Sequence, residues 1–154
     1  SSILRFMVYD CNEDRVSLAK ELSAVEDLLE IHKMKNSEQR NIKLSTEGVK
    51  RFHLIAPLII VNFVENACKH SDAVSNPQGF IDIKIKVDEK DQCFCEISNT
   101  VKKKNQSDSN NHGVGLKNIK KRLELQYANN YVLKENKNND IYSLKLHIPL
   151  ERKK

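Results

Sequence analysis

PLIIVNFVENACKH, residues 57–70, is the stretch that decides the fold. It predicts a single helix, because Pro57 suits the first helical position, where its missing N–H is not needed. Apolar side chains cover most of the surface of this helix and predict that it is buried on most sides. They are Leu58, Ile59, Ile60, Val61, Phe63, Val64, Ala67 and Cys68.

A polar stripe is set into this apolar helix. Asn62, Asn66 and Lys69 are spaced i, i+4, i+7, so their side chains share one face. A buried amide without a partner costs about 1–3 kcal/mol. Two amides in line with a lysine therefore indicate a face that meets a metal, a phosphate or both. A stripe that simply faces water is the alternative at this point.

The composition limits the classes of protein to which the chain can belong. Its 154 residues predict one domain, and a net charge of +5 favours an anionic partner such as a nucleotide, a nucleic acid, an acidic protein or a membrane surface. No segment approaches the roughly 18 apolar residues that span a bilayer, so we expect no membrane contact by this chain. Cys11, Cys68, Cys93 and Cys95 lack the spacing of a zinc site and are predicted to be reduced thiols of a cytosolic protein.

The periodicity of apolar residues predicts an α+β fold. Helical spacing predicts helices at 18–34 and 116–127, besides the one at 57–70. Alternation predicts five strands, at 41–45, 80–87, 93–98, 131–135 and 141–148. A short extended piece is predicted at 16–18, before the first helix. This order predicts a two-layer sandwich with a mixed, mostly antiparallel sheet and helices on one face. Residues 100–112 hold almost no apolar side chain and predict a mobile loop.

Gly113-Val114-Gly115 stands directly before the predicted helix at 116–127. A glycine-rich turn that opens a helix can cradle a phosphate, because free backbone N–H groups and the helix dipole both favour an anion there. A lone pair of glycines is weak evidence, since glycines also make ordinary turns. Together with the amide-bearing helix and the polar loop between them, the pair indicates a phosphate site.

These motifs resemble those of the ATP-binding catalytic domain of sensor histidine kinases, in the superfamily that also holds gyrase B, the Hsp90 chaperones and the MutL repair proteins. Within it the chain is most similar to the LytS/YehU-like group. Residues 57–71 resemble the N box of that group, residues 113–127 its glycine box, and residues 16–35 the segment that opens the domain. The resemblance spans about Arg15 to Leu150 and implies the Bergerat-type ATP-binding fold.

The resemblance implies roles for individual residues. Asn66 would coordinate Mg²⁺ on the ATP phosphates, with Asn62 near the metal and its waters. Lys69 would reach the phosphates and His70 would line the nucleotide pocket. Gly113 and Gly115 would form the hinge of a lid at residues 100–112, above a helix opened by Leu116, Lys117 and Asn118. Glu65 could polarise a water or a metal hydrate, and an i, i+4 ion pair with Lys69 is its alternative role.

Asn99 departs from the pattern of the family. It stands near the end of the strand at 93–98, where the family has an aspartate followed by a glycine that reads adenine. A neutral hydrogen bond is worth about 0.5–1.5 kcal/mol, against about 1.5–3 kcal/mol for a charged one. The resemblance therefore implies that Asn99 contacts adenine weakly. A degenerate nucleotide-dependent interaction module without kinase activity is the alternative function.

The resemblance also implies a division of the chain and its partners. Residues 1–10 would end an upstream dimerisation and phosphoacceptor hairpin, residues 11–150 would form the catalytic domain, and residues 151–154 a basic tail. The acceptor histidine would lie on that hairpin, and a response regulator would receive the phosphoryl group. The chain would belong to the cytoplasmic portion of a membrane-anchored sensor and bind Mg-ATP and Mg-ADP. Its lysine clusters lack aromatic readers, so we expect no nucleic-acid binding.

Overall fold

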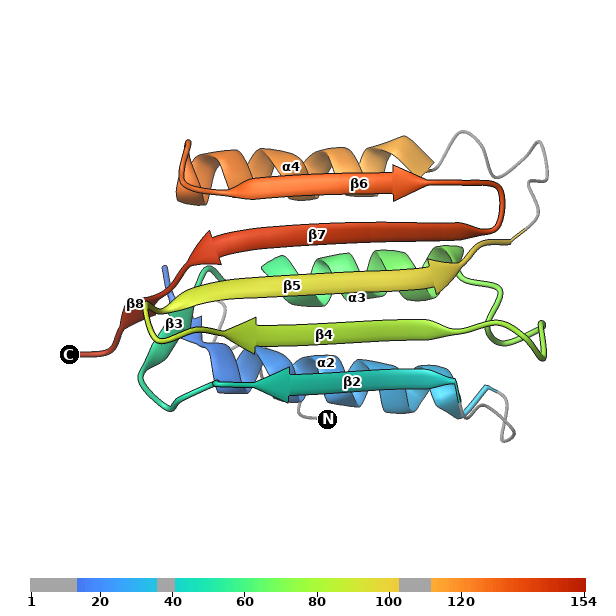
Figure 1. The fold of residues 1–154 in the computed structure, drawn as a ribbon, viewed down its shortest axis with the longest axis horizontal. Helices are drawn as coiled ribbons and strands as arrows, with labels where there is room; N and C mark the ends of the chain where they lie inside the picture. The colour runs from blue at the N-terminus through green and yellow to red at the C-terminus, as the bar shows by residue number, and fades with distance from the viewer. Residues whose placement is uncertain (1–13, 36–40, 103–111) are drawn as a thin grey trace.

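The computed structural model has two layers, with helices covering one face of a five-stranded sheet (Figure 1). It describes residues 14–35, 41–102 and 112–154. The predicted end of an upstream helix at 1–10 and most of the predicted loop at 100–112 lie outside the described residues. None of the helices that the structure describes is both long enough and apolar enough to cross a bilayer.

The large sheet is mixed, as predicted. Its spatial order is β2 (Ile42–Glu47), β4 (Ile81–Val87), β5 (Gln92–Thr100), β7 (Ile141–Pro149) and β6 (Val132–Lys137). Only the β2–β4 pairing is parallel, and the remaining neighbours are antiparallel. Three helices, α2 (Leu18–Lys33), α3 (Ile59–His70) and α4 (His112–Tyr127), lie on one face of this sheet (Figure 1). The predicted α+β sandwich is therefore confirmed.

Alternating apolar residues fix the register of the central strands. Ile83 of β4 pairs with Ile97 of β5, which in turn pairs with Leu144 of β7, and all three side chains are buried beneath the helices. A slip of one residue would turn each of these side chains to solvent. Burying one such side chain contributes about 1.5–3 kcal/mol, so the register at the site is held firmly.

A second, three-stranded sheet at one end of the molecule was not predicted. It consists of β1 (Val16–Ser17), β3 (His53–Ile55) and β8 (Glu151–Arg152), in the order β1-β3-β8. His53 begins β3, and half of the expected basic tail at 151–154 forms β8. Strands of two or three residues are too short to show alternation, which explains why sequence periodicity missed them.

The start of the central helix also differs from the prediction. α3 begins at Ile59 rather than at Pro57, and Leu58 adopts the left-handed conformation, with φ of 67°. A non-glycine residue in that conformation costs about 1–3 kcal/mol. The surrounding structure must therefore hold this turn in place, and the contacts that do so also shape the functional site.

Candidate functional site

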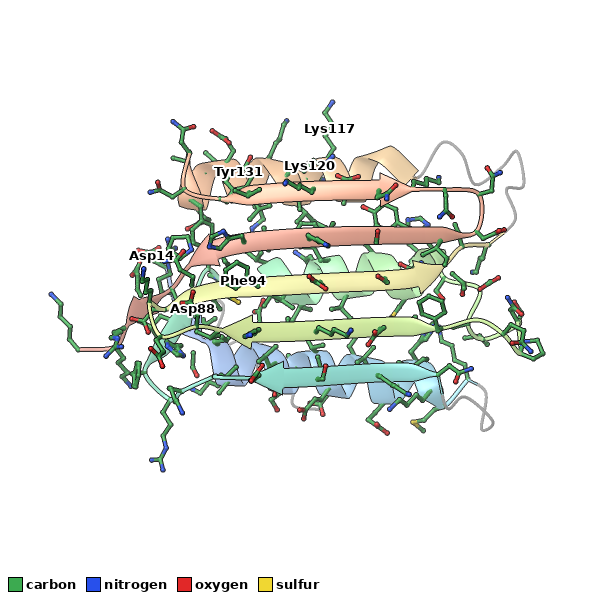
Figure 2. The ribbon with its side chains drawn as sticks, viewed as in Figure 1. Asp14, Asp88, Phe94, Lys117, Lys120 and Tyr131 are labelled. Carbon is green, nitrogen blue, oxygen red and sulfur yellow. The ribbon has the colours of Figure 1, made fainter. Side chains whose placement is uncertain are left out.

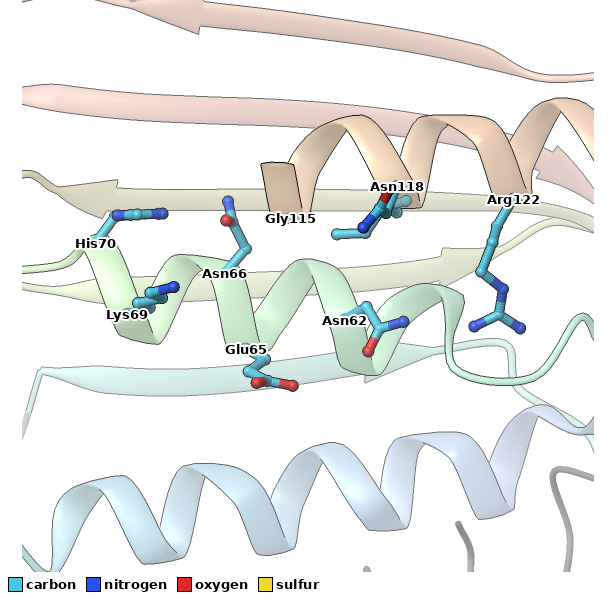
Figure 3. A pocket seen from close by; sticks show the side chains of 9 residues that line it. Asn62, Glu65, Asn66, Lys69, His70, Gly115, Asn118 and Arg122 are labelled. Atoms are coloured by element: carbon cyan, nitrogen blue, oxygen red, sulfur yellow. The ribbon is translucent and has the colours of Figure 1, made fainter. Parts of the chain in front are cut away.

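Two cavities meet between α3 and its neighbours. The first, called here the α3–α4 cavity, has a volume of about 260 Å³ and lies between the two helices (Figure 3). The second, the β-sheet cavity, has a volume of about 170 Å³ and lies between α3, α4 and the last strands of the sheet. Asn66 and His70 line both cavities, so the two spaces adjoin at these side chains.

The predicted polar stripe faces the α3–α4 cavity. Asn62 and Asn66 are half-buried and Lys69 is exposed, and all three line this cavity. In Figure 3 the side chains of Asn66 and His70 rise from α3 toward α4. The stripe therefore borders a cavity that is partly open to solvent rather than a flat surface, which suits a ligand held between the two helices.

Glu65 lies at the margin of the same cavity. Its side chain is exposed and points away from α4 in the view of Figure 3. Among the ion pairs of the described residues, none joins Glu65 to Lys69. The ammonium group of Lys69 is therefore available to an anion in the cavity.

Arg122 of α4 supplies a second cation at the other end of the α3–α4 cavity (Figure 3). Its Nη2 donates a hydrogen bond of 2.7 Å to the carbonyl oxygen of Pro57. This contact fixes the guanidinium above the start of α3. A guanidinium has five N–H donors, so several remain for an anion in the cavity.

Glu21 of α2 caps α3 and was missed by the sequence prediction. Its carboxylate is fully buried and accepts hydrogen bonds from the backbone N–H groups of Leu58 and Ile60, both at 2.8 Å, and of Val61 at 3.3 Å. Burial raises the pKa of Glu21 to about 7, while these N–H groups and the charge of Arg122 oppose the rise. The signal in the sequence was an acid within the apolar stripe of α2.

The β-sheet cavity contains polar atoms that lack partners. Asn99 is 1% exposed, and its Nδ2 donates a hydrogen bond of 2.9 Å to the carbonyl oxygen of Thr100. Its Oδ1 is buried without a hydrogen-bond partner among the described residues, and so is the hydroxyl of Tyr142. Both residues line this cavity. Tyr142 was missed by the sequence prediction, because only the pairing of β5 with β7 places it beside Asn99.

The glycines occupy a different position from the one predicted. α4 begins at His112, so Gly113 and Gly115 lie within its first turn rather than in a turn before it. The first four N–H groups of a helix, counted from the cap residue, have no intrahelical partner, and the N–H group of Gly113 is among them, whereas that of Gly115 is not. A Cβ added at Gly115 would meet no atom within 4 Å among the described residues outside the neighbouring helix backbone.

The residues that follow the glycines point in different directions. Leu116 lines the β-sheet cavity and Asn118 lines the α3–α4 cavity. Lys117 lines neither, and its side chain points outward from α4 (Figure 2). Of this predicted trio, only Leu116 and Asn118 are brought to the site.

The donor atoms of the α3–α4 cavity suit a magnesium ion bound together with phosphates. Within the described parts of the chain, no group of three or more His, Cys, Asp or Glu residues could hold a metal ion alone. The amide oxygens of Asn62 and Asn66 can supply one or two ligands. Mg²⁺ prefers oxygen ligands and keeps several waters, and it usually takes its other ligands from substrate phosphates.

Comparison with solved structures shows which fold this is. A blue-light-activated histidine kinase of Erythrobacter litoralis superposes with a TM-score of 0.59 at 14% identity, over 85% of this chain and 63% of that one. The catalytic domain of histidine kinase ThkA gives a TM-score of 0.58 at 16% identity, over 90% and 97% of the two chains. Full-length ShkA in complex with AMPPNP superposes with a TM-score of 0.57 at 14% identity, over 84% of this chain and 30% of that one.

The chain thus has the fold of histidine kinase catalytic domains and spans less than two thirds of the first of these proteins. No curated protein matches the sequence. The sequence model of the GHKL domain, however, matches residues 24–149, which include α3, α4 and both cavities. The chain belongs to the GHKL domain family.

Proposed function

We propose that this chain is the ATP-binding catalytic domain of a sensor histidine kinase, of the LytS/YehU-like type. The observation that carries the proposal is the junction of the two cavities at Asn66 and His70. One cavity carries two cations and the open end of a helix, which suit a polyphosphate. The other is smaller and contains a buried amide oxygen without a partner, which suits the base of a nucleotide.

In this arrangement the residues of α3 bind the charged end of the nucleotide. Asn66 supplies an amide oxygen to Mg²⁺, and Asn62, one turn earlier, holds waters of the metal. The bound metal would neutralise part of the charge on the phosphates. Lys69 adds a point charge from the same helix. Gly115, in the first turn of α4, lines the same cavity, and the unpaired N–H groups of that turn would bind phosphate oxygens.

The chain would then present the γ-phosphoryl group to a histidine outside the catalytic domain. Phosphoryl transfer depends mostly on positioning and on neutralisation of charge, and the residues of the two cavities supply both. The acceptor would lie on an upstream helical hairpin, which also makes the dimer, and a response regulator would receive the group afterwards. All of these steps would take place on the cytoplasmic side of a membrane-anchored sensor.

The test is the magnesium dependence of nucleotide binding in Asn66→Ala. Without its amide oxygen, we expect the variant to bind Mg-ADP and a non-hydrolysable ATP analogue no better with Mg²⁺ than without it. Calorimetry measures both affinities. Asn129→Ala, in an exposed turn outside both cavities, is the control and should bind as the unaltered chain does. If Asn66→Ala keeps the full effect of Mg²⁺, the assignment of the metal to Asn66 is wrong.

A second function is favoured by one observation, the neutral amide of Asn99 at the position of the family's aspartate. A nucleotide-dependent interaction module could use the same two cavities without transferring a phosphoryl group. Binding measurements do not separate it from a kinase domain, because both bind nucleotide. A transfer assay separates them, since only a kinase domain would label an acceptor histidine.

A further inference from the structure

Arg15 links the segment before β1 to the end of α4, at the end of the molecule that carries the small sheet (Figure 1). Its Nη1 donates a hydrogen bond of 2.7 Å to the side-chain oxygen of Gln126, and its Nη2 donates one of 3.0 Å to the backbone carbonyl oxygen of the same residue. The guanidinium also lies over the ring of Tyr127, 5.1 Å from its centroid. The side chain of Arg15 is only 19% exposed, so these contacts hold it away from most of the solvent.

The position of Arg15 suits the end of a helix. Gln126 and Tyr127 are the last two residues of α4. The last carbonyl groups of a helix have no intrahelical partner, and the negative end of the helix dipole favours a cation. Arg15 supplies both a donor and a positive charge there. Because a guanidinium is a rigid fork of donors, the two bonds to Gln126 fix the direction of this helix end as well as its place.

The end of α4 in turn holds the turn that precedes α3. The backbone N–H of Ala56 donates a hydrogen bond of 2.8 Å to the hydroxyl of Tyr127, and both residues are buried. The next residue, Pro57, accepts the bond from Arg122 through its carbonyl oxygen. Two consecutive residues before α3 are therefore bonded to α4, and Arg15 holds the part of α4 that makes the first of these bonds.

Arg15 can act on the nucleotide cavities only through α4. Arg15, Gln126 and Tyr127 line neither cavity, whereas Arg122 lines the α3–α4 cavity. Arg122 and Gln126 are four residues apart, so they share one face of α4. Apolar packing against the other layers is not directional and does not by itself fix this face. A shift in the end of α4 would therefore move the guanidinium of Arg122 within the cavity.

We propose that Arg15 is a positioning residue of the nucleotide site. By fixing the end of α4, it holds the guanidinium of Arg122 where it pairs with phosphate oxygens, and so it raises the affinity for ATP. This role rests on the proposed function, in which the α3–α4 cavity receives the polyphosphate. Glu21, six residues later, caps α3. One short segment, 15–21, therefore sets the positions of both helices that border the cavity.

The experiment is a double-mutant cycle on the affinity for ATP, measured by calorimetry in the presence of Mg²⁺. We expect Arg15→Ala to bind ATP about three- to tenfold more weakly than the unaltered chain. In the Arg122→Ala background the same substitution should change the affinity by less than about twofold, because the guanidinium that Arg15 positions is absent. Arg15→Lys keeps the charge but lacks the planar fork that bonds both oxygens of Gln126, so it should also bind ATP more weakly.

Glu151→Ala is the matched control. Nε of Arg15 donates a hydrogen bond of 3.1 Å to the carboxylate of Glu151, whose side chain is 61% exposed. This substitution removes one contact of Arg15 and leaves both of its bonds to α4. The variant should bind ATP as the unaltered chain does, which separates the contacts with α4 from the presence of Arg15 at the surface. Thermal denaturation without nucleotide shows that each variant is folded at the temperature of the titration.

The outcomes distinguish the positioning role from the proposed function. Equal losses of affinity in the two backgrounds, or an unchanged affinity in folded Arg15→Ala, overturn the positioning role and leave the proposed function standing. If Arg15→Ala does not fold, Arg15→Lys takes its place in the same cycle and decides the question. If the unaltered chain binds no ATP, the proposed function falls and the positioning role falls with it.

Discussion

At the scale of single residues, the orientation of the Asn99 amide decides what the β-sheet cavity can accept. Nδ2 is used by the carbonyl oxygen of Thr100, which also accepts from the N–H of Asp72. The Nδ2 group of the amide is therefore held by the backbone, whereas its Oδ1 atom has no hydrogen-bond partner among the described residues. A carboxylate, which has no donor, would bring one of its oxygens against the carbonyl oxygen of Thr100.

This arrangement leads to a prediction for Asn99→Asp. Without nucleotide, the variant loses the bond to Thr100 and buries a charge, so its free energy of unfolding should fall by about 1–3 kcal/mol. Urea denaturation measures this difference. Asn136→Asp, which makes the same change on the exposed strand β6, is the control and should be within about 0.5 kcal/mol of the unaltered chain.

The same variant should bind ATP more tightly despite its lower stability. A carboxylate accepts from the amino group more strongly than an amide does, and a gain of about 1.4 kcal/mol corresponds to tenfold in affinity. Titration with ATP, followed by calorimetry, measures the change. Equal or weaker binding by a folded Asn99→Asp would indicate that the amino group of the base does not lie against residue 99.

At the scale of elements, three helices cooperate at the first turn of α3. Glu21 of α2 accepts from the N–H groups of that turn, and Arg122 of α4 donates to the carbonyl oxygen of Pro57. The left-handed Leu58 is held between these contacts. Helix α3 carries Asn62 and Asn66, so the cap on α3 also positions the amides of the site.

Removal of this cap should therefore destabilise the fold. Glu21→Ala leaves buried N–H groups at Leu58, Ile60 and Val61 without acceptors, and each helix cap or buried donor is worth about 1–2 kcal/mol. We expect a loss of at least about 2 kcal/mol in the free energy of unfolding, measured by urea denaturation. Glu26→Ala, an exposed acid of the same helix, should change it by less than about 0.5 kcal/mol.

The pKa of Glu21 predicts the pH dependence of this effect. The pKa rises from about 4.5 in the unfolded chain to about 7 in the fold, so the folded state binds the proton more tightly. The stability that this proton contributes is fully present below pH 4.5 and is lost as the pH rises to 7. Glu21→Gln keeps an acceptor and does not titrate.

The comparison with Glu21→Gln isolates this linkage. Relative to that variant, the unaltered chain should lose about 3 kcal/mol of stability between pH 4.5 and pH 7. Denaturation at several pH values in one buffer series measures the difference between the two proteins. A constant difference across this range would mean that the carboxyl of Glu21 titrates alike in the folded and unfolded states.

Most elements of the fold could be predicted, because their apolar residues are periodic over several turns or pairs. The alternation from Ile81 to Val87 and the helical spacing from Leu18 onward both correspond to observed elements. Boundaries set by distant contacts could not be predicted. α3 begins after Leu58 because Glu21 and Arg122 hold the preceding turn, and nothing within residues 57–70 records either contact.

At the scale of the whole molecule, one part of the candidate site could be predicted from the sequence and another part could not. One wall of the α3–α4 cavity comes from a single helix, α3, so the spacing of Asn62, Asn66 and Lys69 was enough to bring these three side chains together. The β-sheet cavity is assembled from helices and strands that are far apart in sequence. Tyr142 enters it only through the pairing of β7 with β5, which periodicity cannot supply.

In the proposed function the nucleotide and the acceptor histidine lie on different parts of the protein, and this leads to the last prediction. The proposed nucleotide-binding residues lie within α3, α4 and the sheet, whereas the resemblance places the acceptor histidine on an upstream hairpin. Three other histidines are held by packing or by contacts within the fold. His32 and His53 are buried, and His147 stacks on Phe94 and forms a hydrogen bond with Gln92. None of these three lines the α3–α4 cavity, and His70 is the one histidine among the described residues that line it.

We therefore expect this chain to bind Mg-ATP without phosphorylating itself, and to transfer the phosphoryl group once it is joined to the upstream hairpin. The experiment incubates both polypeptides with ATP labelled in the γ-phosphate. A label that is labile in acid and stable in base, as a phosphohistidine is, should appear only on the longer one. Asn66→Ala in the longer polypeptide should abolish it, because positioning and charge neutralisation at the metal are lost. Labelling of the short chain at a histidine would contradict the separation of nucleotide and acceptor. A longer polypeptide that binds Mg-ATP and is never labelled would instead establish the interaction module, because it would have the nucleotide and the acceptor together without transfer.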